Sequence, residues 1–244
     1  MKTSNKIVAT AFLVIIVSTI GYAIAMKKEF LTGNYKKTYI NFSSLPYKNF
    51  NSVTINPSNI INVKLVQGPF KVMVNNVIKD NLTFKQINNT LQVDLNWKYT
   101  RFNTGETYMV VISCPRLVSV HASAVSTLNK QNLIDTLAGE GWAYHQILID
   151  GFKQDSLSVS QEWGSQVLLA NNSLIHLSAI TSINELSGSK LTVLKSNVIQ
   201  QANLDVRNKG KLVLYQANIP GLNYRLADSA LLIMNGAAIK SLKK

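Results

Sequence analysis

The chain has 244 residues, of which 46% are hydrophobic and 15% are charged. This composition excludes a disordered chain and a fibrous repeat, and the length suffices for one large β domain or two small ones. Basic residues number 25 against 12 acidic ones, and the net charge of +13 is spread along the chain without a dense basic block. Such a surplus favours anionic partners in general. A nucleic-acid site would need a contiguous basic stripe, so we expect no nucleic-acid partner.

An uncharged apolar segment lies near the N-terminus, over residues 7–26, with lysines on both sides of it. As a helix these residues would extend about 30 Å, the thickness of the hydrocarbon core of a bilayer. We predict a signal-anchor over residues 1–26 that holds the chain in a membrane, with the rest of the chain exported. The alternative is a signal peptide cleaved after Ala25, since Ala23-Ile24-Ala25 has the small-residue pattern of a cleavage site.

The segment that follows, residues 27–46, is polar and irregular, which predicts a short stalk. Beyond it, apolar and polar residues alternate with the period of two that is typical of strands, for example in Leu91, Val93 and Leu95. We therefore expect an all-β domain over residues 47–244, with antiparallel-leaning strands over 47–128. The single cysteine, Cys114, lies in such an apolar run and is expected to be a small buried residue that forms no disulfide.

A weak internal repeat marks the second half of the chain. A leucine that begins a short apolar run recurs at Leu157, Leu174, Leu191, Leu204 and Leu222. The implied period, roughly 18, is too short for a helical repeat or a propeller blade and fits one coil of a parallel β-solenoid. Stacked coils would bury their apolar residues in one continuous column. The repeat therefore predicts solenoid rungs over residues 129–242.

Three short patterns follow one another along the chain: F-x-S-V-x-I from Phe50, V-x-L-x-Q-G from Val63, and P-x-L-x-S-V-x-A-S-x-x-S from Pro115. Together with their surroundings they resemble the head-GIN domain family, adhesin-head proteins of Bacteroidetes-type envelopes. The resemblance implies an all-β domain that ends in a right-handed parallel β-solenoid, a location in the bacterial envelope with the domain exported to the periplasm or the cell surface, and no established enzymatic activity. The later turns depart from the family pattern, because the Gly-Ala-Ser repeat is reduced here to fragments such as Ser187-Gly188-Ser189.

Aromatic residues offer the clearest candidates for a ligand site. Trp142 and Tyr144 lie close together, and Trp163 follows them after about one coil. Aromatic side chains on adjacent coils would lie about 5 Å apart and would form a platform for sugar rings. The alternative is that they fill the interior, where aromatic rings bury a large apolar area.

The remaining reactive residues favour a non-catalytic protein. The three histidines, His121, His145 and His176, lack a second ligand at metal-binding spacing, so we expect no metal and no cofactor. A polysaccharide lyase or hydrolase on a β-helix is the alternative, and its carboxylates would come from Glu140, Asp150, Asp155 and Glu162. Their spacings do not match the coil step. We therefore expect an adhesin-like binding or scaffold module whose partner is a glycan or an envelope protein, and the sequence leaves its oligomeric state open.

Overall fold

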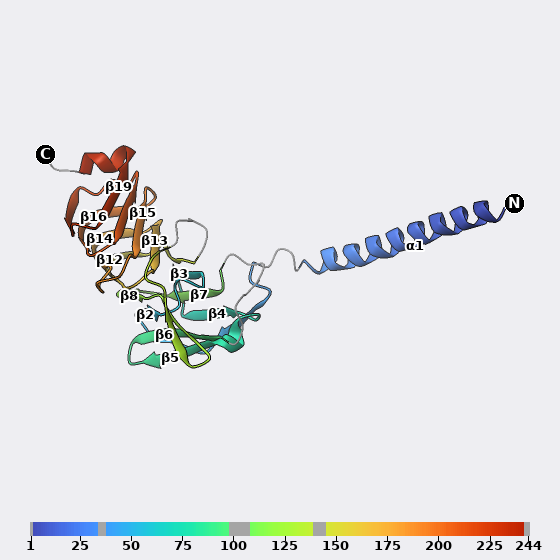
Figure 1. Ribbon diagram of the computed structural model, residues 1–244, viewed down its shortest axis with the longest axis horizontal. Helices are drawn as coiled ribbons and strands as arrows, with labels where there is room; N and C mark the ends of the chain where they lie inside the picture. The colour runs from blue at the N-terminus through green and yellow to red at the C-terminus, as the bar shows by residue number, and fades with distance from the viewer. Residues whose placement is uncertain (1, 34–37, 98–107, 139–144, 242–244) are drawn as a thin grey trace. The chain divides into compact units, whose positions relative to one another are not determined.

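The computed structural model describes residues 2–33, 38–97, 108–138 and 145–241, with the side chains of Trp97, Lys240 and Ser241 left aside. The chain divides into two compact units, Met1–Asn41 and Phe42–Lys244 (Figure 1). The first unit contains helix α1 (Thr3–Thr32), whose last turn lies within the predicted stalk. This helix ends at Gly33, whose left-handed backbone (φ 68°) lets its N–H donate to the carbonyl of Phe30.

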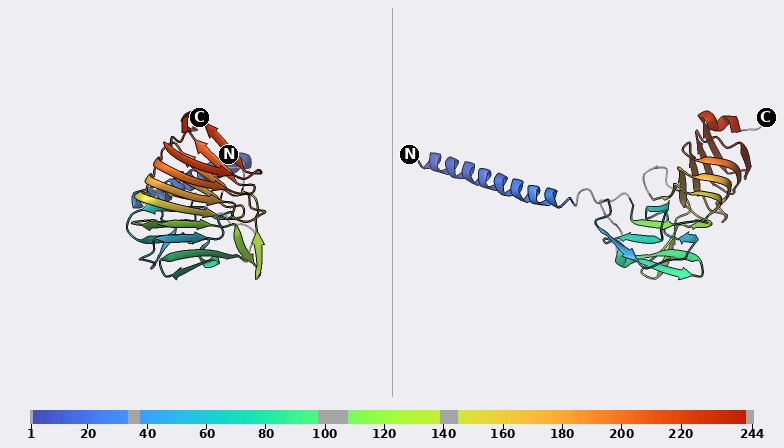
Figure 2. Two further views of the ribbon diagram at one scale, coloured as in Figure 1. Left: turned by 90° about the vertical axis from the view of Figure 1, so that its left-hand side faces the viewer. Right: turned by 180° about the vertical axis from the view of Figure 1, so that it is seen from behind.

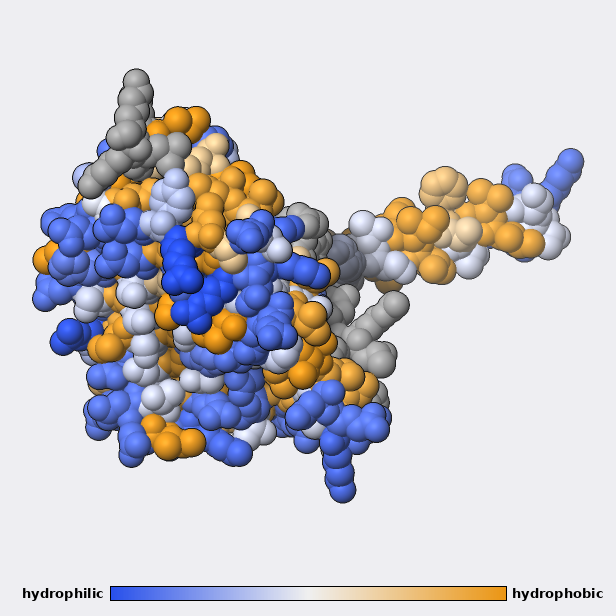
Figure 3. All heavy atoms as spheres, turned by 60° about the vertical axis from the view of Figure 1, so that its left-hand side comes forward, coloured by the Kyte–Doolittle hydropathy of each residue, from blue (hydrophilic) through white to orange (hydrophobic). Residues whose placement is uncertain are grey.

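Helix α1 is apolar around its circumference, and none of its described residues is buried. Figure 3 shows its apolar side chains as an uncovered surface along the helix. It is long and apolar enough to cross a membrane, and it includes the whole predicted segment 7–26. The predicted apolar helix is thereby confirmed. A signal sequence has the same length and composition, so the uncleaved anchor stays a prediction.

The second unit is mostly β, as predicted, and its described strands form two sheets (Figures 1 and 2). Sheet 1 has the strand order β1 (Phe42–Leu45), β4 (Lys71–Asn75), β7 (Val110–Cys114), β3 (Val63–Gln67), β11 (Ile147–Asp150), β13 (Gln166–Ala170), β15 (Lys190–Leu194), β17 (Lys211–Tyr215) and β19 (Leu231–Asn235). Sheet 2 has the order β10 (Gln131–Ile134), β9 (Val125–Leu128), β6 (Thr90–Trp97), β2 (Ser52–Ile55), β8 (Ser119–Ala122), β12 (Lys153–Gln161), β14 (Ser173–Thr181), β16 (Val198–Val206) and β18 (Gly221–Leu226), and β5 (Leu82–Ile87) pairs with β6. Two 3-10 helices, η2 (Lys79–Asn81) and η3 (Gly236–Ser241), complete the described elements.

From β11 onward the chain alternates between the two sheets, and each strand pairs in parallel with the strand of the previous pass. The left view of Figure 2 shows these strands stacked along the unit. Parallel pairing also occurs within residues 47–128, where β2 pairs with β6 and β8, and β3 pairs with β7. Antiparallel pairs join β1 to β4, β4 to β7, β5 to β6 and β9 to β10. Both sheets are therefore mixed, and their strand orders are open.

The coil length predicted from the leucines is wrong. The register pairs Lys153 with Ser173, Gln166 with Lys190, and Leu174 with Ile199, and each of these steps is longer than the leucine spacing. The leucines misled the count because they belong to different sheets: Leu191 lies on β15 of sheet 1, whereas the other four lie on sheet 2. One pass of the chain is longer than the leucine spacing because it must supply one strand to each sheet and two turns.

The core lies between the sheets and takes alternate residues from each strand. Val167 and Leu169 of β13 point into it from sheet 1, and Leu177 and Ala179 of β14 from sheet 2. Cys114 lies in the same core and is 1% exposed, which confirms the predicted buried cysteine. Burial raises the pKa of its thiol to about 12, although a backbone hydrogen bond from Arg116 acts in the opposite direction. The thiol is therefore protonated and unreactive at neutral pH.

Two buried asparagines hold the turns that lead from sheet 1 to sheet 2. The side chain of Asn172 accepts from the backbone N–H of Phe152 (2.9 Å), and its amide donates to the carbonyl of Ile149 (2.9 Å). Asn197 occupies the same place one pass later: its Oδ1 accepts from the Asn172 backbone N–H (3.0 Å) and its amide donates to the carbonyl of Leu169 (2.7 Å). Three successive passes are thus joined by hydrogen bonds that satisfy buried polar groups.

An ion pair joins two strands on the outer side of sheet 1. The ammonium of Lys64 on β3 lies 2.9 Å from Asp150 on β11, and the amide of Asn171 donates to the same carboxylate at 2.7 Å. Partial burial alone would raise the pKa of Asp150, but the hydrogen bonds from Asn171 and Lys64 and the charge of Lys64 outweigh it and hold the pKa below its usual range.

Replacing the buried asparagine should destabilise the second unit strongly. Asn172→Ala removes the acceptor of Phe152 and the donor to Ile149, so we expect the free energy of unfolding to fall by about 2–4 kcal/mol. The measurement is urea denaturation of the full-length protein in detergent micelles, followed by the β signal in circular dichroism. Asn218→Ala, at an exposed turn position before β18, is the matched control and should cost less than about 0.5 kcal/mol. Equal losses in the two variants would contradict the role given to Asn172.

The Lys64–Asp150 pair predicts a pH-dependent contribution to stability. Because the pKa of Asp150 is lower in the folded than in the unfolded chain, the stabilisation is complete above the unfolded pKa of about 3.9 and is lost as the pH falls through the folded value. Asp150→Asn should therefore lower the free energy of unfolding by about 1 kcal/mol at pH 7, and this difference from the wild type should shrink below about pH 4. Denaturation curves at several pH values measure it, with Asp155→Asn as the control. A difference that is independent of pH would show that the ion pair is not its cause.

Candidate functional site

The outer face of sheet 2 carries a continuous column of small polar side chains. Parallel strands in register place corresponding residues side by side, and on this sheet one outward position is polar on seven consecutive strands. In strand order the residues are Thr90, Ser52, Ser119, Ser158, Ser178, Asn203 and Asn223. We call them the hydroxyl–amide column. None of the seven is buried, and with a strand separation of about 4.8 Å the column extends roughly 29 Å.

A second outward column runs beside the first, two residues further along each strand. It contains Gln92, Thr54, His121, Ser160, Ile180, Asp205 and Arg225. Six of these seven side chains can donate or accept hydrogen bonds. The two columns together give sheet 2 a polar outer surface, in contrast to the apolar residues that the same strands turn inward.

His121 of the second column is the centre of a small group of polar side chains. Its Nδ1 lies 2.9 Å from the hydroxyl of Ser160 on the neighbouring strand, and its Nε2 lies 4.0 Å from the Glu162 carboxylate. A histidine between a serine and a carboxylate is also the composition of hydrolase triads. Here His121 and Glu162 are partly exposed on the outer surface of the sheet. The contact with Ser160 orients the imidazole of His121.

A shallow hollow of about 340 Å³ lies over the last strands of sheet 2, β14, β16 and β18. Its lining includes Asn203 and Asn223, whose amides are joined by a hydrogen bond of 3.2 Å, and Asp205, which accepts from the Arg207 guanidinium at 2.7 Å. Tyr224 of β18 also borders it, but its pairing with the buried Leu204 turns its side chain to the inward side of the sheet. Amides, a carboxylate and a guanidinium are groups that bind hydroxyl-rich ligands.

The predicted aromatic platform is described at one position. Trp163 lies in the turn between β12 and β13, in the left-handed conformation (φ 53°) and partly buried, and its carbonyl accepts from the Ser187 hydroxyl at 2.9 Å. The equivalent position one pass later, two residues after the end of β14, is occupied by the non-aromatic Ile183, whose N–H donates to the carbonyl of Gln161. Trp142 and Tyr144 lie outside the described residues. A ligand platform at these three residues stays a prediction.

The structure does not bring the described carboxylates of the enzyme alternative together. Asp150 lies on sheet 1 in its pair with Lys64. Asp155 is near the start of β12 on sheet 2, and Glu162 follows the end of the same strand, roughly 23 Å away along the extended chain. Glu140 lies outside the described residues. Within the described part of the chain, no group of three histidine, cysteine or acidic residues is placed to hold a metal ion.

The sequence alone did not predict the hydroxyl–amide column, because the column joins residues that are distant in sequence. One signal was present: the dipeptide Ser-Val begins at Ser52, Ser119 and Ser158, and all three serines stand at the same register of sheet 2. Ser52 and Ser119 belong to two of the motifs that carry the family resemblance. Without the strand pairing, the irregular spacing of these dipeptides could not be converted into a column.

Comparison with known proteins gives likeness in fold. The sequence matches no family model and no curated protein. A solved structure from Parabacteroides distasonis, described as a "putative adhesin", superposes with a TM-score of 0.50 at 12% identity and covers 79% of this chain and 80% of its own. Another "putative adhesin", from Bacteroides fragilis, has a TM-score of 0.43 at 12% identity and covers 80% of this chain and 96% of its own. At such identity, the likeness to the Parabacteroides protein shows that this chain shares its fold.

Proposed function

We propose that the protein is a non-catalytic, adhesin-like binding module of the bacterial envelope that is anchored in the membrane by α1. Its second unit recognises a glycan across the hydroxyl–amide column. Its second unit is then a right-handed parallel β-solenoid of the head-GIN type. The two-sheet arrangement with parallel strands in successive passes supports this architecture. The apolar helix α1 supports the location in the membrane. The fold shared with the Parabacteroides structure supports the adhesin-like class.

The observation that carries the proposal is the polar character of one outward position on seven consecutive strands. A packed sheet needs only its inward residues to be apolar, so the outward residues are free to vary among polar and charged types. In this column they are confined to hydroxyl and amide side chains. A rigid row of hydrogen-bonding groups at a constant spacing matches a linear polymer that also presents hydroxyl groups at a constant spacing.

Recognition across such a face needs no closed pocket. Neutral hydroxyl and amide groups form hydrogen bonds of modest net strength, so affinity depends on several contacts made at once on a preorganised surface. The glycan would cross the strands along the column, with the hollow over β14, β16 and β18 as the place where Asn203, Asn223 and Arg225 contact a sugar. The enzyme alternative has less support, because Asp150, Asp155 and Glu162 are not brought together.

The test is binding of the full-length protein in detergent micelles to a glycan array and to isolated peptidoglycan. The double variant Ser158→Val, Ser178→Val removes two adjacent hydroxyl groups and keeps side chains that suit a strand. We expect its affinity for the glycan that the wild type binds to fall about tenfold, as the loss of two hydrogen bonds implies.

The matched control is the double variant Ser44→Val, Thr83→Val, which changes two exposed positions on β1 and β5 and should keep wild-type affinity. A further variant, Trp142→Ala with Trp163→Ala, tests the aromatic platform separately. Wild-type protein that binds no glycan would contradict the proposal and favour an envelope protein as the partner. Equal affinity in the wild type and the serine variant would move the binding site away from the column.

A further inference from the structure

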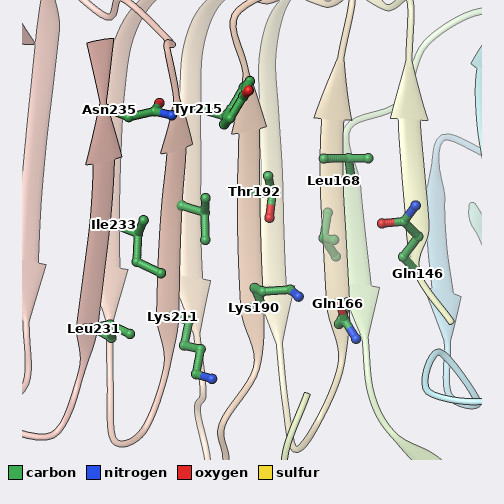
Figure 4. A pocket seen from close by; sticks show the side chains of 12 residues that line it. Gln146, Gln166, Leu168, Lys190, Thr192, Lys211, Tyr215, Leu231, Ile233 and Asn235 are labelled. Atoms are coloured by element: carbon green, nitrogen blue, oxygen red, sulfur yellow. The ribbon is translucent and has the colours of Figure 1, made fainter. Parts of the chain in front are cut away.

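The outer face of sheet 1 differs from that of sheet 2 and borders a groove of about 350 Å³ (Figure 4). Three rows of outward side chains cross its strands β13, β15, β17 and β19. The first row is Gln166, Lys190, Lys211 and Leu231, and the second is Leu168, Thr192, Val213 and Ile233. The third row includes Tyr215 and Asn235, which Figure 4 shows on the far side of the second row from the lysines.

The middle row, apart from Thr192, forms an apolar floor. Leu168, Val213 and Ile233 occupy outward positions, whereas the hydroxyl–amide column of sheet 2 has serine and asparagine at its outward positions. The apolar surface continues to the last strand of the sheet, where Leu231 is 47% and Ile233 is 45% exposed. Outward apolar side chains gathered along a groove are characteristic of a surface that binds an apolar partner.

The charge of the groove is one-sided. Lys190 and Lys211 are paired in register on neighbouring strands and stand on the same side of the apolar floor. Among the described residues that line the groove, these two lysines are the charged ones, and Tyr215 and Asn235 on the opposite side are neutral and polar. In its described lining, the groove therefore combines two lysines on one side with an apolar floor that reaches β19, the edge strand of sheet 1.

We propose that this groove binds a single-chain anionic amphiphile, a fatty-acid anion, with its carboxylate against Lys190 and Lys211 and its alkyl chain over Val213 and Ile233. The positive side complements the one charge of such a ligand, and the floor complements its chain. The volume lies at the lower end of the range for small-molecule sites, about 300–1,000 Å³. Because β19 is the edge strand of the sheet and Leu231 is exposed there, a longer alkyl chain can continue over Leu231. This site is separate from the hydroxyl–amide column and does not depend on glycan binding.

The test uses the full-length protein in nanodiscs of zwitterionic phosphatidylcholine. The probe added to them is dodecanoic acid that carries a photoreactive diazirine. Mass spectrometry of the irradiated sample maps the label to peptides, which separates label on strands β15 to β19 from label on α1. We expect label on residues 190–235. Unlabelled dodecanoate should compete for it, and dodecyltrimethylammonium, with the same chain and the opposite charge, should not.

Two variants and a control identify the groups responsible. The double variant Lys190→Gln, Lys211→Gln should lower the groove label about fivefold or more, since it removes both charged donors. Val213→Asp should lower it further by placing a carboxylate on the floor. The control Lys153→Gln, Lys195→Gln removes the same charge from exposed positions outside the groove and should keep the label. Circular dichroism of each variant verifies the fold, and if the lysine variant does not fold, the competition between the two amphiphiles decides.

Three results would overturn the proposal. Equal competition by the cationic and anionic amphiphiles would show that charge does not select the ligand. Undiminished groove label in the folded lysine variant would exclude Lys190 and Lys211 as the anion site. Crosslinks between the grooves of two chains, without label from the fatty acid, would identify a second copy of the protein as the occupant.

Discussion

Parallel pairing in register is the constraint on which the second unit depends. A strand in this arrangement satisfies its backbone groups only through the strands of the previous and following passes, so every pass must return to the same register. Once the register is fixed, residues of different passes stand side by side in columns. Inward columns become the core, and outward columns become the two surfaces of the unit.

The turns maintain this register with buried side chains. Asn172 and Asn197 occupy equivalent positions in successive passes. Each side chain forms hydrogen bonds with buried backbone groups of the neighbouring passes. An apolar residue at these positions would pack but would leave donors and acceptors without partners. The Lys64–Asp150 pair adds a smaller, partly exposed contribution between β3 and β11.

The two outer faces have different chemistry although they belong to the same passes of the chain. Sheet 2 presents Ser158, Ser178 and Asn203 where sheet 1 presents Leu168, Thr192 and Val213. A polar surface interacts with hydroxyl-rich ligands and with water, whereas an apolar floor beside lysines interacts with an amphiphile. The two proposed sites therefore lie on different faces of one unit, and the two proposals can be tested independently.

Local patterns of the sequence determined the apolar helix, the β character of the second unit and the burial of Cys114, because each depends on neighbouring residues alone. Only the tertiary structure decided which strand belongs to which sheet: Leu191 and Leu204 look alike in sequence and lie on opposite sheets. It also decided the length of a pass and the columns on both faces. The physical reason is that strand pairing is a long-range interaction, and a shift of one residue in register would turn every side chain to the other face.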